Sequence, residues 1–167
     1  MKKDVSMYFD LITSLKTTQE VINFVSEIDA LQLAFFKSEK TSIEKALTSI
    51  SLNSANKITQ AFSKNNLDTN NRVVVSGFFE TLKELIKKLK TIKLVLAFDP
   101  TDKTIEKIHN FVKDILGIGY VLDIETSEDV LGGAIVIFNG KYNDFTLKKR
   151  VEDAFILKNK DILQLYK

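Results

Sequence analysis

The chain has 167 residues, of which 44% are hydrophobic and 28% are charged, proportions typical of one globular domain or of two small ones. It has no cysteine and a single histidine, His109, which excludes disulfides and thiol nucleophiles and argues against a histidine-rich metal site or a hydrolytic triad. Lysine and arginine number 24 against 22 acidic residues, a net charge of +2 that does not suit a nucleic-acid-binding protein.

The first half of the chain, residues 1–90, shows apolar residues at helical spacing, which predicts a bundle of short helices. Each of these helices is too short to be stable alone, so we expect packing to supply most of the stability. The helices are expected to start near Val5, Thr18, Leu31, Ser42, Asn53 or Ser54, and Arg72, the last of them running to Lys90 after a polar loop at residues 65–71.

The second half, residues 91–167, reads as strand, helix, three strands and helix, so we expect an α+β protein with a helical bundle followed by a small β-α-β-β-β-α domain. Asn139-Gly140 is a strong hairpin signal between two of the strands. The strands are predicted at residues 91–98, 120–124, 134–138 and 141–144, and the final helix from Thr146. The helix between the first two strands carries one apolar row, formed by Ile105, Ile108, Val112, Ile115 and Leu116.

Several polar groups admit a functional and a structural interpretation. Gly132-Gly133 lacks the neighbours of a phosphate-binding loop, so we expect a backbone role at a strand entrance. His109 has no orienting carboxylate in its pattern, and we expect it to be a boundary or solvated residue. The acidic cluster at residues 123–129 lacks the calcium-loop pattern and is expected to be a solvated turn. The lysines at positions 83, 87, 88 and 90 are expected to be a solvated helix face.

Three cations, Lys148, Lys149 and Arg150, fall in the first turn of the final helix, where they oppose the helix dipole. Three arrangements remain open for them: compensation by a nearby carboxylate such as Asp144, pairing with an acidic partner, or simple extension into solvent.

The segment from Gly132 to Val151 resembles the signature of the δ subunit of bacterial F-type ATP synthases, whose mitochondrial counterpart is the oligomycin-sensitivity-conferring protein. The resemblance covers the order of elements along the whole chain, and the sequence pattern over about residues 92–155. The chain departs from the family at Ser127-Glu128, Ala134, Ile137 and Phe145. The matching positions are Gly132, Gly133, the turn Asn139-Gly140, Asp144, Thr146, Leu147, Arg150 and Val151.

The resemblance implies a non-catalytic stator subunit that links the catalytic head to the peripheral stalk, with no cofactor and no metal. Residues 1–90 would bind N-terminal helices of the α subunits, and residues 91–167 the C-terminal helix of the b subunit. We therefore expect a cytoplasmic protein, without signal peptide or membrane insertion, held at the inner face of the membrane through the complex.

The resemblance also places the α-subunit groove between the first and fifth helices of the bundle. On the expected helices, its walls would be Tyr8, Leu11, Ile12 and Leu15 on one side and Ile58, Ala61 and Phe62 on the other. The alternative function is a regulatory or nucleic-acid-binding module with a ferredoxin-like sheet.

Overall fold

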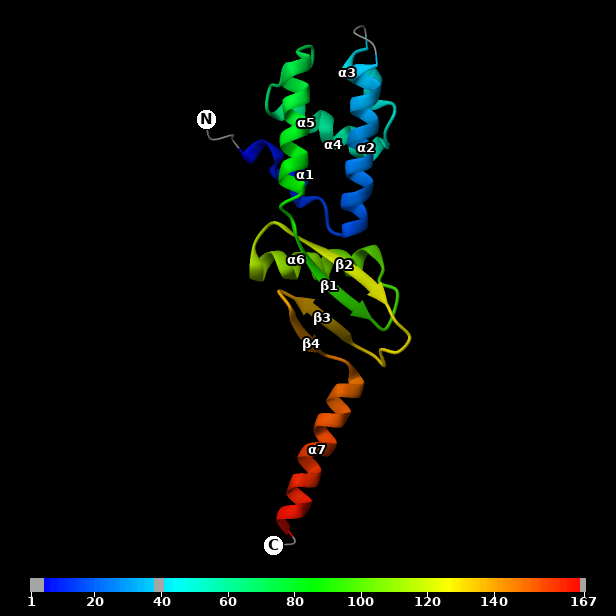
Figure 1. The fold of residues 1–167 in the computed structure, drawn as a ribbon, viewed down its shortest axis with the longest axis vertical. Helices are drawn as coiled ribbons and strands as arrows, with labels where there is room; N and C mark the ends of the chain where they lie inside the picture. The colour runs from blue at the N-terminus through cyan, green and yellow to red at the C-terminus, as the bar shows by residue number, and fades with distance from the viewer. Residues whose placement is uncertain (1–4, 38–40, 166–167) are drawn as a thin grey trace. The chain divides into compact units, whose positions relative to one another are not determined.

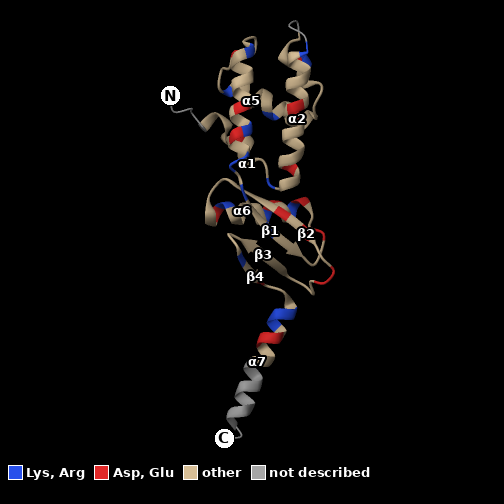
Figure 2. Ribbon diagram, in the orientation of Figure 1, with Lys and Arg blue, Asp and Glu red and all other residues tan. Residues whose placement is uncertain are grey.

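The computed structural model describes residues 5–37 and 41–165, with the side chains of residues 6–37 and 41–156. The chain forms two compact units, one holding the residues up to Lys90 together with Gly117–Gly119, the other Thr91–Leu116 and the residues from Tyr120 onward. The first is helical and the second contains a four-stranded sheet (Figure 1), so the expected α+β class is confirmed. Acidic and basic residues are interspersed along the described ribbon of both units (Figure 2), in keeping with the near-neutral net charge.

The helical unit starts with a short 3-10 helix and continues with five α-helices (Figure 1). Side-chain caps fix four of the helix starts: Thr17, Ser42, Ser51 and Asn71 each accept backbone N–H groups of the first turn that would otherwise lack a partner. The elements are η1 (Val5–Tyr8), α1 (Phe9–Thr13), α2 (Thr18–Phe36), α3 (Ile43–Leu47), α4 (Leu52–Lys64) and α5 (Arg72–Ile86).

Aromatic rings form the centre of the helical core. Phe78 lies 4.9 Å from both Tyr8 and Phe62 between ring centroids, and Phe79 lies 5.4 Å from Phe78. The contacts with Phe62 and Phe79 are edge-to-face, the arrangement that ring quadrupoles favour. Phe79 and Leu82 are completely buried, so α5 contributes its whole inner face to this core.

Three expected boundaries in the bundle are wrong. The last helix, α5, ends at Ile86 and not at Lys90, which already belongs to a strand. The separate helix expected at Leu31 does not exist, because α2 runs without a break from Thr18 to Phe36. No glycine or proline interrupts this stretch, and Leu31 and Phe35 continue the buried row of Phe24 and Ile28. The next expected start, Asn53 or Ser54, lies inside α4, since Ser51 is the cap.

The sheet unit has the expected order of elements: β1 (Lys90–Leu96), α6 (Asp102–Leu116), β2 (Tyr120–Thr126), β3 (Ala134–Phe138), β4 (Lys141–Asp144) and α7 (Leu147–Leu165). The strand order is β2-β1-β3-β4. β3 pairs antiparallel with both β1 and β4. β1 and β2 run in the same direction, because Lys90 N–H donates to the Gly119 carbonyl at their start and Ser127 N–H donates to the Leu96 carbonyl at their end.

One face of the sheet packs on α6, with Leu94, Leu96 and Leu122 against Ile105, Ile108 and Val112. Ile115 and Leu116, the last two residues of the same apolar row, are exposed. Helical spacing predicts which face of a helix is apolar, but it does not predict where along the helix the contact with the sheet ends.

Candidate functional site

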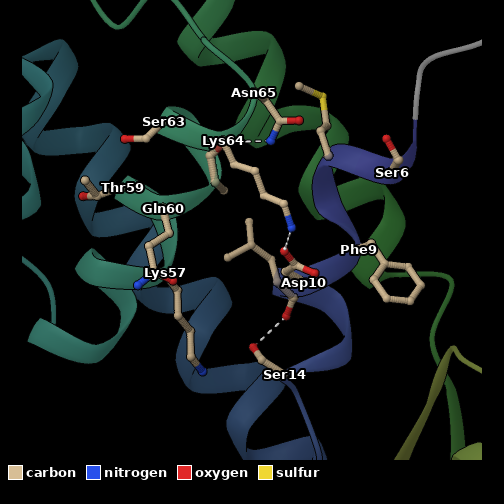
Figure 3. A pocket seen from close by; sticks show the side chains of 13 residues that line it. Ser6, Phe9, Asp10, Ser14, Lys57, Thr59, Gln60, Ser63, Lys64 and Asn65 are labelled. Atoms are coloured by element: carbon tan, nitrogen blue, oxygen red, sulfur yellow. Dashed lines mark hydrogen bonds and ion pairs between the residues drawn. The ribbon is translucent and has the colours of Figure 1, made fainter.

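An open groove of about 970 Å³, the α1–α4 groove, lies between η1–α1 and α4 in the helical unit (Figure 3). Leu11 and Ala61, both buried, form its floor. The ammonium group of Lys64 reaches across to the carboxylate of Asp10 at 2.5 Å, whereas the ring of Phe9 lies to the outside. Both charged side chains are largely exposed, so this ion pair contributes little to stability.

The walls of the α1–α4 groove are polar, and the side chains of Ser14, Thr59 and Asn65 already form hydrogen bonds within the protein. Ser14 donates to the Leu11 carbonyl at 2.8 Å, and Thr59 to the Ala55 carbonyl at 2.9 Å. The side-chain amide of Asn65 donates to the Ala61 carbonyl at 2.7 Å. These groups bond to their own helices instead of converging on a ligand.

A second groove, the η1–α5 groove, is smaller, about 290 Å³, and predominantly apolar. Its floor is the Tyr8–Phe78 ring pair, and Thr81 lies beside it. Burial raises the pKa of the Tyr8 hydroxyl, which shares a hydrogen bond with Thr81. This satisfied polar pair leaves an apolar floor bordered by Met7, Leu67, Val74 and Gly77.

Gly77 opens a notch in the wall of the η1–α5 groove. It lies in the middle of α5 with ordinary helical backbone, and no atom outside its own surroundings in the helix lies within 4 Å of the position a Cβ would occupy. A glycine inside a helix destabilises it by about 1 kcal/mol relative to alanine. Since nothing within the chain fills the notch, no internal contact requires this glycine.

The predicted partner-binding residues lie together at the interface of η1–α1 with α4, but almost all are buried. Ile12 is half-buried; the other six, Tyr8, Leu11, Leu15, Ile58, Ala61 and Phe62, are core residues. Tyr8, Leu11 and Ala61 nevertheless reach the two grooves with part of their surface, so a role of these residues in binding a partner stays a prediction. Each short helix has one apolar row, and in this bundle that row packs into the hydrophobic core.

Because α2 is a single helix, the fifth helix of the bundle is α5 and not the segment that carries Ile58, Ala61 and Phe62. In this count, the groove that α5 borders together with η1 is the η1–α5 groove. Its α5 wall consists of Val74, Gly77, Phe78 and Thr81. Sequence reasoning missed Gly77, although a lone glycine within a helical pattern was the available signal.

In the sheet unit, the Gly-Gly motif joins the start of β3 to the start of α7. Gly132 and Gly133 have positive φ of 68° and 86°. A Cβ on Gly133 would lie 2.4 Å from the Phe145 carbonyl oxygen, so only glycine fits. Leu147 N–H donates to the Gly132 carbonyl at 3.0 Å, which ties the helix start to the motif.

The remaining motif residues have separate roles. Asn139 and Gly140 form the β3–β4 turn with positive φ of 49° and 73°. Asp144 accepts the Thr146 N–H at 2.9 Å, and hydrogen bonding from Thr146 lowers the pKa of the Asp144 carboxyl. Thr146 caps α7 by accepting the Lys149 N–H at 3.2 Å, whereas Arg150 is exposed.

The candidate reactive residues do not form a constellation. His109 is buried, whereas a boundary or solvated residue was expected. Its Nε2 lies 3.2 Å from the Tyr120 carbonyl oxygen and can donate to it, which satisfies a polar group of the buried ring. In the acidic cluster, Glu125 pairs with Lys93 at 2.7 Å, and Glu128 and Asp129 are exposed. Among the residues that the structure describes, no three His, Cys, Asp or Glu side chains gather into a metal site.

The expectation that the four lysines share one solvated helix face is wrong, because only Lys83 lies within α5, where it pairs with Asp29. Lys87 and Lys88 follow the end of the helix and are exposed. Over the described part of the chain, no helix combines the length and the apolarity needed to cross a bilayer. In comparisons with known proteins, no family model matches the chain, and no curated protein does.

Proposed function

We propose that the protein is a non-catalytic stator subunit of an F-type ATP synthase, which connects α subunits of the catalytic head to the b subunit of the peripheral stalk. The support is the resemblance of the Gly132–Val151 segment together with the η1–α5 groove. Such a connector needs grooves that bind helices, and it does not need a reactive centre. Its function is to resist the torque that rotation produces. Peripheral placement at the membrane through the complex belongs to the same proposal.

The single observation that carries the proposal is the apolar η1–α5 groove with its notch at Gly77. Helix-in-groove recognition places the apolar face of an amphipathic helix between two helices and depends on a few anchors. The Tyr8–Phe78 floor offers the apolar contact area. The notch lets a partner backbone approach α5 more closely than any larger residue at position 77 would permit.

The test is titration of a synthetic peptide, the N-terminal helix of the α subunit from the same organism, into the full chain by calorimetry and amide NMR. We expect saturable binding that shifts signals of η1 and α5. Gly77→Leu should weaken it at least about 30-fold, the equivalent of about 2 kcal/mol. Because leucine has a higher helix propensity than glycine, the same variant should unfold at a higher temperature than the wild type.

Ala30→Leu is the matched control, since Ala30 is an exposed small residue of α2 that borders neither groove. It should leave peptide affinity unchanged. Signal shifts confined to α1 and α4 would transfer the site to the α1–α4 groove and reject the role given to Gly77. No binding at high micromolar peptide would remove the α-subunit contact from the proposal.

A further inference from the structure

Asn139 and Gly140, at the tip of the β3–β4 hairpin, combine a reactive dipeptide with an open place in the fold. Both residues are exposed. Apart from its chain neighbours, no described atom lies within 4 Å of the position that a Cβ on Gly140 would occupy. Asn139 is also the only asparagine in the sequence that a glycine follows.

The chemistry open to such a pair is intramolecular. The backbone nitrogen of the residue after an asparagine can attack the side-chain amide carbon, Cγ, and close a cyclic succinimide. A following glycine favours this attack, because it has no Cβ to hinder the nitrogen and its backbone rotates easily. The nitrogen must lose its proton to become a nucleophile, so the attack is easier where the N–H is not held in a hydrogen bond.

Neither reacting group of the pair is engaged in the part of the chain that the structure describes. The Gly140 N–H and the Asn139 side chain form no hydrogen bond there. The two-residue turn explains this, because Phe138 and Lys141 form the last cross-strand pair and the turn residues lie beyond it.

Asn53 provides a comparison within the same chain. It is also exposed and also precedes a small residue, Ser54. The N–H of Ser54, however, donates to the Ser51 hydroxyl oxygen at 3.3 Å in the first turn of α4. A pair with similar side chains is therefore held by a helix cap in one place and left open at a hairpin tip in the other.

The folded turn slows the reaction but leaves a route to it. Asn139 has a φ of 49°, in the left-handed region, where its Cβ lies on the far side of the residue from the next backbone nitrogen. Ring closure thus requires the backbone at residue 139 to rotate, which opens the tip of the hairpin. Local openings of this kind cost less free energy than global unfolding, and β4 is a four-residue strand at the edge of the sheet.

We propose that Asn139 is a modification site, at which the chain converts its own asparagine into aspartate and isoaspartate. Hydroxide takes the proton of the Gly140 nitrogen, which then bonds to Cγ of Asn139. The Cγ–Nδ2 bond breaks, and Nδ2 takes a proton from water and leaves as ammonia. Water then hydrolyses the ring. Cleavage between the Gly140 nitrogen and Cγ gives aspartate, and cleavage between this nitrogen and the main-chain carbonyl carbon of residue 139 gives isoaspartate.

The two products have different consequences for the sheet. Aspartate adds a negative charge but keeps the main chain, and it tolerates positive φ, so the turn remains. Isoaspartate runs the main chain through the former side chain and lengthens the turn by one methylene group. The turn then no longer fits the register that pairs Phe138 with Lys141 and Ile135 with Asp144. The disturbance would reach the start of α7, because Asp144 accepts the Thr146 N–H.

The experiment incubates the full chain at mildly alkaline pH and follows each asparagine by peptide mapping with mass spectrometry. We expect Asn139 to react at least about 10-fold faster than Asn53, since glycine leaves the attacking nitrogen open. Methyl transfer by a protein isoaspartate methyltransferase measures the isoaspartate formed. Asn139→Gly should abolish this signal at residue 139 while the turn is kept, because Gly-Gly also suits it.

Asn139→Asp separates the two products, because it supplies aspartate from the start. Freshly purified, it should unfold at the same temperature as the unmodified wild type, whereas the isoaspartate fraction of the aged protein should unfold at a lower temperature. Equal unfolding temperatures for the aspartate and isoaspartate forms would reject the damage to the hairpin.

Two results would overturn the site itself. One is an intact Asn139 in the folded chain under conditions in which the urea-unfolded chain reacts there, since the turn would then protect the residue completely. The other is faster modification of Asn53 or of another asparagine in the folded chain.

Discussion

The guanidinium carbon of Arg72 lies 4.7 Å from the ring centroid of Phe35. The same guanidinium lies 5.7 Å from the ring of Phe36 and donates to the Thr41 carbonyl. One side chain at the first position of α5 thereby contacts the end of α2 and the chain leading to α3. Its planar, delocalised charge suits both stacking on a ring and a directed hydrogen bond.

Replacing Arg72 should loosen this corner of the bundle. We expect Arg72→Lys to lower the free energy of unfolding by about 0.5–1 kcal/mol, because an ammonium group is more strongly hydrated and lacks the planar fork. Denaturant titration followed by circular dichroism measures the change. The control is Lys45→Arg at an exposed position of α3, which should be neutral; equal stability of Arg72→Lys and the wild type would show that the stacking contributes nothing.

Gly133 should tolerate no side chain. Gly133→Ala places a Cβ 2.4 Å from the Phe145 carbonyl oxygen in a backbone with positive φ, and we expect a loss of about 2–4 kcal/mol from the clash and the strain together. Gly140→Ala is the matched comparison, since its φ is also positive but no atom lies near the new Cβ. It should cost only about 1–2 kcal/mol. Thermal unfolding of both variants measures the difference between the two losses of stability. Equal losses would show that the Phe145 carbonyl oxygen does not approach position 133 closely.

Phe79 should be the most sensitive position of the helical core. It is fully buried and contacts the rings of Phe62 and Phe78, so Phe79→Ala should cost about 3–5 kcal/mol. Phe9, an aromatic residue that is largely exposed, provides the comparison, and Phe9→Ala should cost less than about 1 kcal/mol. Comparable losses for the two variants in urea titrations would contradict the assignment of the core.

The hydrogen bonds at Asp144 predict a specific dependence on acid. The Thr146 hydroxyl and N–H lower the pKa of the Asp144 carboxyl in the folded protein below its ordinary value of about 3.9. A lowered folded-state pKa contributes stability above the unfolded pKa, and this contribution is lost as the pH falls through the folded value. Asp144→Asn should therefore flatten the stability profile below about pH 4. Stability measured from pH 7 to pH 2 checks this, and identical profiles would refute it.

The sequence anticipated the sheet unit better than the bundle. Asn139-Gly140 fixes its turn through local chemistry, because few other pairs adopt two successive positive φ angles, and the strands on either side follow the predicted bounds closely. In the bundle, one continuous helix from Thr18 to Phe36 and two shorter ones show the same apolar spacing. Periodicity reports the face of a helix and carries little information about where the helix ends.

The candidate sites depended on information that a single sequence does not carry. From the sequence, an apolar residue such as Leu11 or Ile58 can equally be an anchor for a partner or a core residue. The structure shows that both are buried in the core. The cations at 148–150 were recognisable as anomalous because the dipole argument is local. That Lys149 pairs with Asp153 depended on side-chain geometry.

The association of Gly117–Gly119 with the helical unit means that the chain passes between the two units three times, not once. A fragment that stops at Lys90 would omit these residues and would leave the Lys90 N–H without the Gly119 carbonyl that accepts it at 2.8 Å. A single cut at residues 90–91, where the sequence pattern changes from helical to strand-like, therefore does not separate the two units. To express the helical unit by itself, the segment Gly117–Gly119 has to be supplied together with the helices. It can be joined to them through a short linker, or kept attached by a circular permutation of the chain.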